Sequence, residues 1–287
     1  MKIQFNWRSV VLFLSVNGLI FFNSTSALAQ YNEVGIQLGV SRYKGELSPH
    51  SFSTRFIHFA GGVFFRHNWN LHWSWIAELN FGKVSGDDSF SKTTFEQNRN
   101  LNFSSTIIDF TPGVEFNFFR YETGNSNYPF TPYLFTGLSV FKFNPKSGGV
   151  ELQPLGTEGQ GLPGRPKPYS RVALAIPIGG GIKISVGQSV GIGIQVSARR
   201  TFTDYLDDVS TTYPDINQLR ASKGNDAALF SDPGAFNDSI PDYPIYEGKE
   251  RGTPSDKDWY LFGTFTLWVR MTSFQREHCK PFKRRRY

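Results

Sequence analysis

Apolar and polar residues alternate along much of this 287-residue chain. In the clearest segment, 71–84, nearly every second residue is apolar, while His72, Ser74 and Glu78 fall on the opposite face and Ile76 is the exception. Successive side chains of a strand point to opposite faces, so such alternation over about ten residues is typical of a strand between lipid and a polar lumen. The segment therefore predicts a membrane-spanning β-strand.

The same alternation predicts a strand in seven more segments. The segment 130–143 alternates less cleanly than the others, and we include it because of its place between two clear strands. The full set of additional predicted strands is 34–41, 57–66, 108–118, 130–143, 173–184, 190–199 and 259–271.

Short and long connections alternate between these predicted strands. The short ones fall near 68–70, 121–129 and 187–188, and the long ones at 46–54, 87–100, 144–167 and 203–256. Barrels with short periplasmic turns and long extracellular loops show this arrangement, and an even strand number then leaves both termini in the periplasm. The stretch 212–256, rich in Gly, Pro, Asp and Asn and without sustained periodicity, predicts an irregular external loop.

The N-terminus has the features of an export signal. Lys2 and Arg8 precede or flank an apolar stretch at 10–22, and Ala27 and Ala29 supply small residues at a cleavage site. A short apolar core followed by such a site is typical of a secretory signal peptide. We predict that residues 1–29 are cleaved; an uncleaved N-terminal anchor is the alternative.

The composition narrows the fold class. The chain has 28 Phe, 12 Tyr and 6 Trp, yet its mean hydropathy is −0.33. No apolar run after the signal reaches the roughly 18 residues that a spanning helix needs. A large secreted β-protein and a membrane barrel remain, and the alternating connections favour the barrel. We predict an all-β fold, a transmembrane antiparallel up-and-down β-barrel of about eight strands over residues 30–274, set among outer-membrane lipids.

The predicted lumen carries charge. A barrel of eight strands is too narrow for an open pore and is filled by side chains, and buried charges need partners. We expect a lumenal network of ion pairs formed by Glu78, Asp109, Glu115, Lys183 and Arg199. Catalysis by His72, Ser74 and Glu78 is the alternative, but alternate residues on one strand do not by themselves set hydrogen-bond geometry.

No sequence pattern points to a cofactor, a resident metal or nucleic acid. The motifs GxxxxGK[ST], HExxH and CxxC do not occur, and we expect a non-enzymatic protein. Three carboxylates, Asp204, Asp207 and Asp208, follow the seventh predicted strand. They could bind Ca²⁺ as hard oxygen ligands, but pairing with Arg199 and Arg200 is the plainer interpretation.

The C-terminal tail, 275–287, concentrates the positive charge. Its six cations and Glu277 give a net charge of +5, so the rest of the chain after the signal is near −1. Cys279 is the only cysteine, which excludes an internal disulfide and indicates an intermolecular bond or a free thiol. We predict a basic periplasmic tail that docks on an acidic partner; contact with anionic lipid headgroups is the alternative. The expected partner-binding residues are Cys279, Lys280, Lys283, Arg284, Arg285 and Arg286.

Three motifs carry a family resemblance. Residues 202–210, Phe-Thr-Asp-Tyr-Leu-Asp-Asp-Val-Ser, resemble a signature of the PorG-like outer-membrane proteins of Bacteroidetes. The segments 80–88 and 279–282 resemble two further motifs of that family, and the likeness extends over the chain after the signal. The signature residues are Phe202, Asp204, Tyr205, Asp207 and Asp208. The resemblance implies a component of the type IX secretion system, associated with a periplasmic ring of the lipoprotein PorK and its partner PorN.

The preferred hypothesis is a non-enzymatic barrel that anchors or organises a periplasmic secretion assembly. A surface receptor or adhesin that acts through the loops is an alternative. A lipid-modifying enzyme is another, and it would need a His–Ser pair on the lipid-facing side near the outer leaflet, which the alternation pattern does not supply.

Overall fold

The computed structural model describes residues 30–48, 56–237 and 244–271. The predicted signal peptide and the basic tail therefore lie outside the described residues. Within them, the strands are β1 (Tyr31–Lys44), β2 (His58–Asn68), β3 (Trp73–Asp87), β4 (Asn102–Asn117), β5 (Phe130–Gly137), β6 (Ser139–Lys142), β7 (Pro145–Ser147), β8 (Val150–Glu151), β9 (Val172–Val186), β10 (Val190–Thr201) and β11 (Trp259–Met271).

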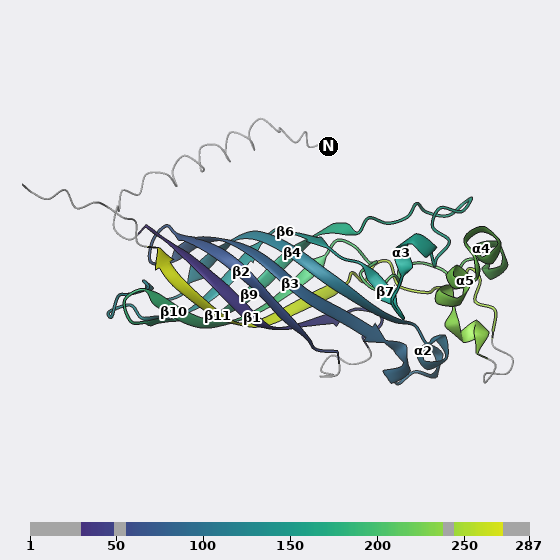
Figure 1. Ribbon diagram of the computed structural model, residues 1–287, viewed down its shortest axis with the longest axis horizontal. Coiled ribbons are helices and arrows are strands. Elements are labelled where there is room, and N and C mark those ends of the chain that lie inside the picture. The colour runs from purple at the N-terminus through teal and green to yellow at the C-terminus, as the bar shows by residue number, and fades with distance from the viewer. Residues whose placement is uncertain (1–29, 49–55, 238–243, 272–287) are drawn as a thin grey trace, which may run out of the picture.

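Antiparallel pairing closes these strands into a ring (Figure 1). The order is β3-β2-β1-β11-β10-β9-β5-β4, and pairing of β3 with β4 completes the circle. β6 continues β5 along the same path, since it also pairs with β4 and β9. The prediction of an eight-stranded antiparallel barrel is confirmed. Closure leaves no unpaired edge, which is how a sheet can stand in lipid.

The weak alternation of segment 130–143 has a structural cause. Its inward positions include Tyr133, Phe135, Phe141 and Phe143, all buried, while Leu134 and Val140 face outward. Both faces of this strand are therefore apolar, which removes the contrast on which a period of two depends.

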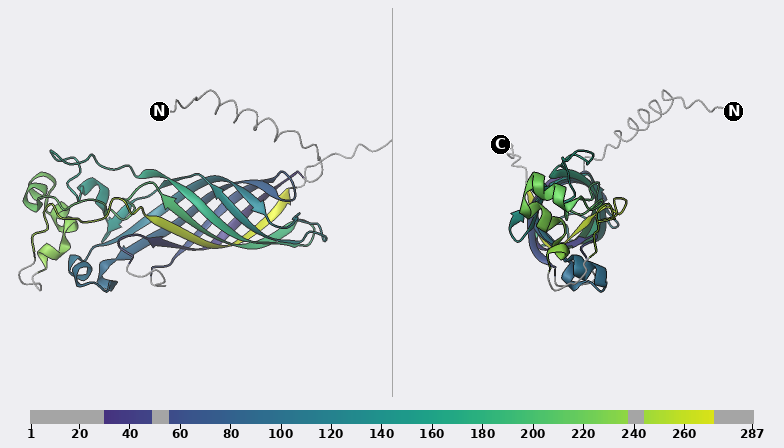
Figure 2. Two further views of the ribbon diagram at one scale, coloured as in Figure 1. Left: turned by 180° about the vertical axis from the view of Figure 1, so that it is seen from behind. Right: turned by 90° about the vertical axis from the view of Figure 1, so that its right-hand side faces the viewer.

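The two ends of the barrel differ. At the turn end, strands are joined by the short connections 69–72, 118–129 and 187–189. At the other end, the chain builds an ordered cap, which we define as residues 88–101, 143–171, 202–237 and 244–258 (Figures 1 and 2). The cap holds β7, β8, η1 (Asp88–Phe90), α2 (Thr94–Arg99), α3 (Leu152–Leu155), α4 (Ile216–Lys223), α5 (Asn225–Ser231) and η2 (Pro233–Phe236).

The expectation that 212–256 is irregular is wrong for its first half. Asp215 starts α4 by accepting hydrogen bonds from Asn217 N and Gln218 N, and Gly224 ends it with a positive φ of 95°. Leu219 and Ala227 are fully buried in the cap. Helices of eight and seven residues bury too few apolar side chains to give a recognisable period.

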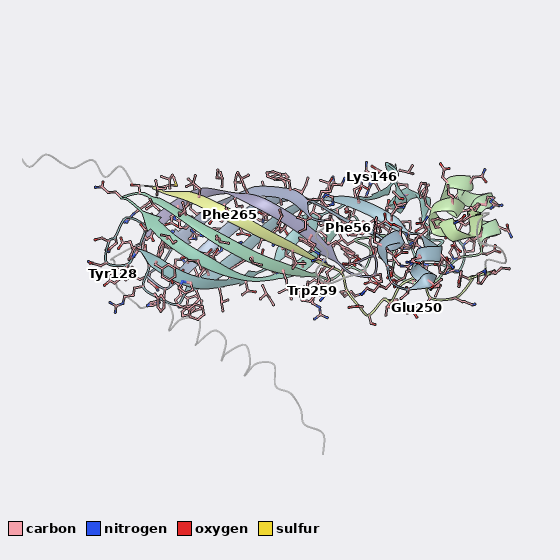
Figure 3. All side chains as sticks on the ribbon, turned by 90° about the horizontal axis from the view of Figure 1, so that it is seen from below. Phe56, Tyr128, Lys146, Glu250, Trp259 and Phe265 are labelled. Atoms are coloured by element: carbon pink, nitrogen blue, oxygen red, sulfur yellow. The ribbon has the colours of Figure 1, made fainter. Side chains whose placement is uncertain are left out.

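The outer wall of the barrel is apolar. Phe265, for example, projects outward from the middle of β11 with 69% of its surface exposed (Figure 3). The apolar belt consists of exposed side chains such as Val34, Ile36, Leu38, Phe59, Val63, Phe81, Phe110, Ile178, Ile194 and Leu267. A girdle of exposed aromatic rings follows at the turn end, formed by Trp69, Trp73, Phe118, Phe119 and Phe130. A belt with an aromatic girdle is typical of a lipid-facing barrel surface. None of the described helices has the length and apolar character needed to cross a membrane.

Apolar side chains also fill parts of the interior. At the turn end, Phe64, Ile76, Tyr121 and Trp268 form one cluster, which explains why Ile76 departs from the alternation of its strand. Gly191 makes room for this cluster, because a Cβ there would lie 2.2 Å from Trp268 Cε2. A larger cluster lies where barrel and cap meet, and it includes Tyr43, Phe103, Phe141, Leu206, Val209, Tyr260 and Phe262.

Candidate functional site

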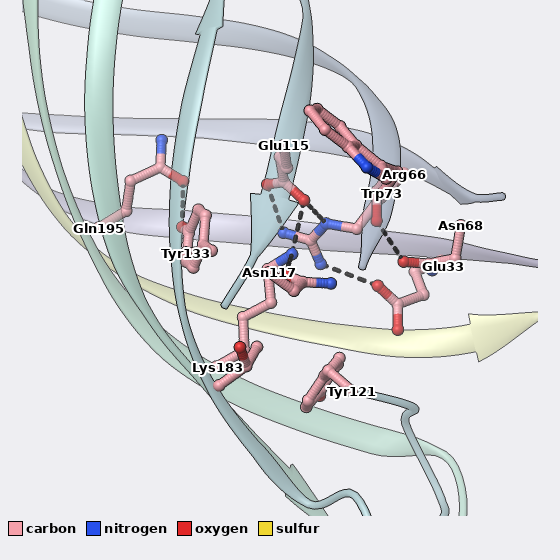
Figure 4. Close-up of polar contacts among 12 residues, drawn as sticks. Glu33, Arg66, Asn68, Trp73, Glu115, Asn117, Tyr121, Tyr133, Lys183 and Gln195 are labelled. Carbon is pink, nitrogen blue, oxygen red and sulfur yellow. Dashed lines mark hydrogen bonds and ion pairs between the residues drawn. The ribbon is translucent and has the colours of Figure 1, made fainter. Parts of the chain in front are cut away.

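Arg66 is the centre of a lumenal charge network near the turn end (Figure 4). Its Nη1 donates to Glu33 Oε2 at 2.8 Å, and its Nε donates to Glu115 Oε2 at 2.6 Å. Lys183 Nζ lies 2.6 Å from the same Glu115 oxygen. Lys183 is on β9, which stands across the barrel from β2, the strand of Arg66. All four side chains are almost completely buried, so two cations and two anions balance within the lumen.

Arg199 forms a second network closer to the cap. Its Nε lies 3.0 Å from Asp109 Oδ2, and its Nη2 lies 3.3 Å from Glu78 Oε2. Tyr260 Oη donates to the same Asp109 oxygen, and Gln195 Nε2 donates to Glu78 Oε1 at 2.8 Å. The two networks thus fill the lumen with hydrogen-bonded, ion-paired groups, and the second network has one carboxylate more than it has cations.

The structure therefore places all five predicted network residues inside the barrel. Glu115 is paired with Lys183, whereas Arg199 pairs with Asp109 and Glu78. Arg66 and Glu33 also belong to the network, although the charge pattern did not single them out. The sequence could have indicated Arg66 as a lumenal residue, because it lies on the inward face of a clearly alternating strand.

We expect the lumen to be closed to ions. The ion-paired side chains occupy a barrel that is already narrow, so we expect them to block a continuous water path. Full-length protein in planar bilayers should show no sustained single-channel conductance. Stable, voltage-independent openings would contradict the filled lumen.

The residues considered for lumenal catalysis, His72, Ser74 and Glu78, each contact a different partner. His72 Nδ1 lies 2.9 Å from the carbonyl oxygen of Asn117, and Ser74 Oγ donates to Asn68 Oδ1 at 2.6 Å. Glu78 is held by the Arg199 network. The three side chains have separate partners, as expected for structural polar groups.

The structure brings together one His–Ser pair that the alternation pattern did not indicate. His58 Nε2 lies 2.6 Å from Ser85 Oγ across the β2–β3 pair, and both side chains are partly buried. Among the described residues, no carboxylate is hydrogen-bonded to His58, so the pair lacks the orienting third group that an activated serine uses.

The motif 202–210 forms the centre of the cap. Asp208, at a left-handed φ of 71°, accepts hydrogen bonds from Tyr169 Oη at 2.6 Å and from Thr157 Oγ1. Arg251 Nη1 donates to the Asp208 carbonyl oxygen at 2.6 Å and to Glu158 Oε1 at 3.2 Å. Of the motif, Phe202 is exposed, whereas nearly all the residues from Asp204 to Ser210 are buried.

Pairing of the motif carboxylates with Arg199 and Arg200 is therefore wrong. Arg199 is taken up by the lumen, and Arg200 lies over the Trp259 ring at 6.0 Å. Both arginines lie in β10, which ends at Thr201, and Asp204 follows in the cap. Sequence proximity here does not bring opposite charges together.

Four carboxylates gather at the barrel–cap border: Glu46, Asp204, Asp207 and Asp258. Tyr43 Oη lies 2.6 Å from Asp207 Oδ2 and 2.7 Å from Asp258 Oδ1. One oxygen from each of Glu46, Asp204 and Asp258 lies within 4.8 Å of the others. We call these four residues the acidic cluster.

Burial and mutual repulsion raise the pKa values of the acidic cluster. Burial, with the nearby charge of Asp204, raises the pKa of Glu46 to about 7. Burial also raises the pKa of Asp204 to about 6. For Asp207 and Asp258, burial and the charges of the other carboxylates hold the pKa well above its usual range. The cluster is therefore an electrostatically unfavourable arrangement for the protein alone.

The predicted tail site, which comprises Cys279, Lys280, Lys283, Arg284, Arg285 and Arg286, lies outside the described residues.

Comparison with known proteins identifies the family. Residues 11–234 match the family model described as a domain of unknown function (DUF6089). The chain belongs to this family. No curated protein matches the chain.

Several solved structures are similar to the DUF6089 chain at low identity. Ail, the attachment invasion locus protein of Yersinia pestis, in complex with the heparin analogue sucrose octasulfate, is 11% identical with a TM-score of 0.39, covering 85% of this chain and 100% of its own. Neisserial surface protein A is 8% identical with a TM-score of 0.41, covering 84% and 97%. The outer membrane enzyme PagL is 9% identical with a TM-score of 0.33, covering 82% and 97%.

The closed ring, the apolar belt and the aromatic girdle establish the general class of this protein. They are the features of an outer-membrane β-barrel, in which lipid surrounds the wall and polar groups face inward.

Proposed function

We propose that this DUF6089 protein is a non-enzymatic, non-conducting outer-membrane barrel that anchors or organises a periplasmic protein-secretion assembly. The observation that carries the proposal is the filled lumen, in which Arg66, Glu115 and Arg199 hold buried ion pairs. A barrel without a pore or a reaction chamber acts through what its two ends present.

We place the cap outside the cell and the turn end in the periplasm. Short periplasmic turns and long external loops are the usual arrangement in such barrels. In this orientation β11 ends in the periplasm, and the basic tail 275–287 follows it there. The tail is then available to a periplasmic partner.

The family resemblance and the charge of the tail support the proposal of a specific assembly. The motifs at 202–210, 80–88 and 279–282 resemble PorG-like proteins, which implies a type IX secretion component next to a PorK-like and PorN-like ring. The tail holds a net +5 in thirteen residues, and such a concentration favours docking on an acidic surface.

The tail should determine which proteins accompany the barrel. Deleting Lys280–Tyr287 should remove a periplasmic lipoprotein from native-membrane pull-downs made in reducing buffer, because the cationic docking segment is lost. A variant with Lys223→Gln, an exposed cation of α4 in the cap, is the control and should keep the partner. Unchanged co-purification after the deletion would reduce the tail to a membrane-surface contact.

Cys279 should form a disulfide with that partner. A lone cysteine in an exported protein commonly bonds to another chain or stays a reactive thiol. Non-reducing gels of native membranes should show a higher-mass band that vanishes in Cys279→Ser. If no band appears and maleimide labels the thiol completely, the disulfide does not exist. Electrostatic docking of the tail is tested separately by the deletion of Lys280–Tyr287.

A surface receptor or adhesin is the second candidate, favoured by the ordered cap. Exposed apolar side chains occur on it, among them Phe236, Leu229 and Ile245, the last with 83% of its surface accessible. Loss of binding to cells or matrix after substitution of these residues, with unchanged co-purification through the tail, would support this function.

A further inference from the structure

We propose that the barrel–cap border binds a divalent cation, with Ca²⁺ as the best chemical match, through Glu46, Asp204 and Asp258. This inference does not depend on the proposed function, because it concerns the end of the barrel opposite to the one where β11 ends.

The sheet register brings the three ligands together from distant parts of the sequence. Glu46 follows β1, Asp204 follows β10, and Asp258 precedes β11. β11 lies between β1 and β10, with Trp259 opposite Lys44 on one side and opposite Arg200 on the other. The three connections therefore start at one point of the rim.

Unsatisfied oxygens distinguish this group from an ordinary set of buried acids. Asp204 is only 2% exposed, and its Oδ1 has no hydrogen-bond partner, whereas its Oδ2 accepts from Ser210 Oγ. Glu46 Oε2 is likewise buried without a partner, while Oε1 accepts from Thr253 N. A buried, unpaired carboxylate oxygen is costly, so a missing positive partner is the simplest explanation.

Tyr43 cannot satisfy the remaining contacts by itself. Its hydroxyl has one proton but lies within 2.7 Å of both Asp207 and Asp258. Only one of the two carboxylates can accept that proton. The backbone N–H groups of Leu206 and Val209 donate to the other oxygens of Asp258 and Asp207, so no donor remains for the unpartnered oxygens of Glu46 and Asp204, which a bound cation can satisfy.

The same cap shows how the fold satisfies a buried carboxylate with protein groups. Glu158 is 1% exposed and receives the Arg251 guanidinium together with the backbone N–H groups of Ser210 and Thr211. Asp88 receives a bidentate contact from Arg99. In the acidic cluster, two carboxylate oxygens have no hydrogen-bond donor, and the nearby Lys257 donates to the carbonyl oxygen of Pro254 instead.

The donor set selects a hard cation. All three ligands are carboxylate oxygens, which Ca²⁺ binds at about 2.3–2.6 Å in a flexible geometry completed by water. Two such oxygens on opposite sides of the ion lie about 5 Å apart, consistent with the observed limit of 4.8 Å. Two positive charges also offset the repulsion that raises the pKa values of the cluster.

Terbium luminescence can test the site on the full-length barrel in detergent after chelator treatment. Tb³⁺ replaces Ca²⁺ at oxygen sites, and Tyr43, which contacts two carboxylates of the cluster, can sensitise its emission. Wild-type protein should show saturable emission that Ca²⁺ displaces. Asp204→Asn and Asp258→Asn should each reduce it at least tenfold, whereas Asp226→Asn, an exposed carboxylate of α5, should not.

Hydrogen exchange of the cap amides provides a second measurement that separates binding from a purely structural role. In wild-type protein, Ca²⁺ at about 100 times its Kd should slow exchange at Leu206 and Val209 by about 100-fold relative to chelator. Asp204→Asn removes one buried negative charge, so in chelator its cap should exchange more slowly than the wild type. In Ca²⁺ the order should reverse. Equal wild-type exchange with and without Ca²⁺, or Tb³⁺ emission unchanged in both variants, would overturn the proposal.

Discussion

Replacing Glu115 with alanine should lower the free energy of unfolding of the barrel by about 3–5 kcal/mol, since it removes one partner of a buried charge network. Glu115 accepts from both Arg66 and Lys183, and all three side chains are at most 2% exposed. The substitution leaves the two cations of this network, Arg66 and Lys183, with Glu33 as the one remaining carboxylate of the network. Their desolvation is then uncompensated.

Unfolding in urea, followed by heat-modifiable migration and by tryptophan fluorescence, measures this loss. Glu122→Ala is the matched control, because Glu122 pairs with Arg270 at 3.0 Å at the partly exposed turn end. A partly exposed pair is worth about 0–1 kcal/mol. Equal destabilisation by the two substitutions would mean that water reaches the lumenal network, and the closed-lumen prediction would fail with it.

The strands were predictable from sequence because lipid imposes a simple rule on every second residue. The segment 71–84 shows it most clearly, and the segment 130–143 fails only because large rings such as Phe141 also turn inward. Alternation also assigns charges to the lumen. The alternation does not predict which charges form ion pairs. Glu115 on β4 pairs with Lys183 on β9, and these two strands are neither consecutive in sequence nor neighbours in the barrel.

The cap was beyond prediction for a different physical reason. Its contacts join residues far apart in sequence, such as Glu46 with Asp204 and Asp258, and depend on the register of β1, β10 and β11. The carboxylates of the motif were recognisable as candidate Ca²⁺ ligands, but their nearest cations in sequence proved to be directed into the lumen or along the wall. Glu46, in a different connection, carried no local signal.

The second large effect is expected in the cap. Arg251→Ala should lower the free energy of opening the cap by about 3 kcal/mol or more, because Glu158 would keep its charge in a buried site without the guanidinium. The substitution also removes the hydrogen bonds that Arg251 donates to the carbonyl oxygens of Asp208 and Ser231. Amide exchange in the cap should accelerate roughly a hundredfold, the equivalent of that energy.

The barrel itself should survive Arg251→Ala, because the ring is closed by strand pairing that does not involve the cap. Heat-modifiable migration should therefore remain, while protease should cleave the cap faster. Arg220→Ala, which removes an exposed cation of α4 from its contact with the Phe236 ring, is the control and should leave both properties near wild type. Leu206 and Val209 of the cap pack in one hydrophobic cluster with Phe141 and Tyr260 of the barrel wall. If Arg251→Ala also unfolded the barrel, this shared core would make wall and cap a single cooperative unit.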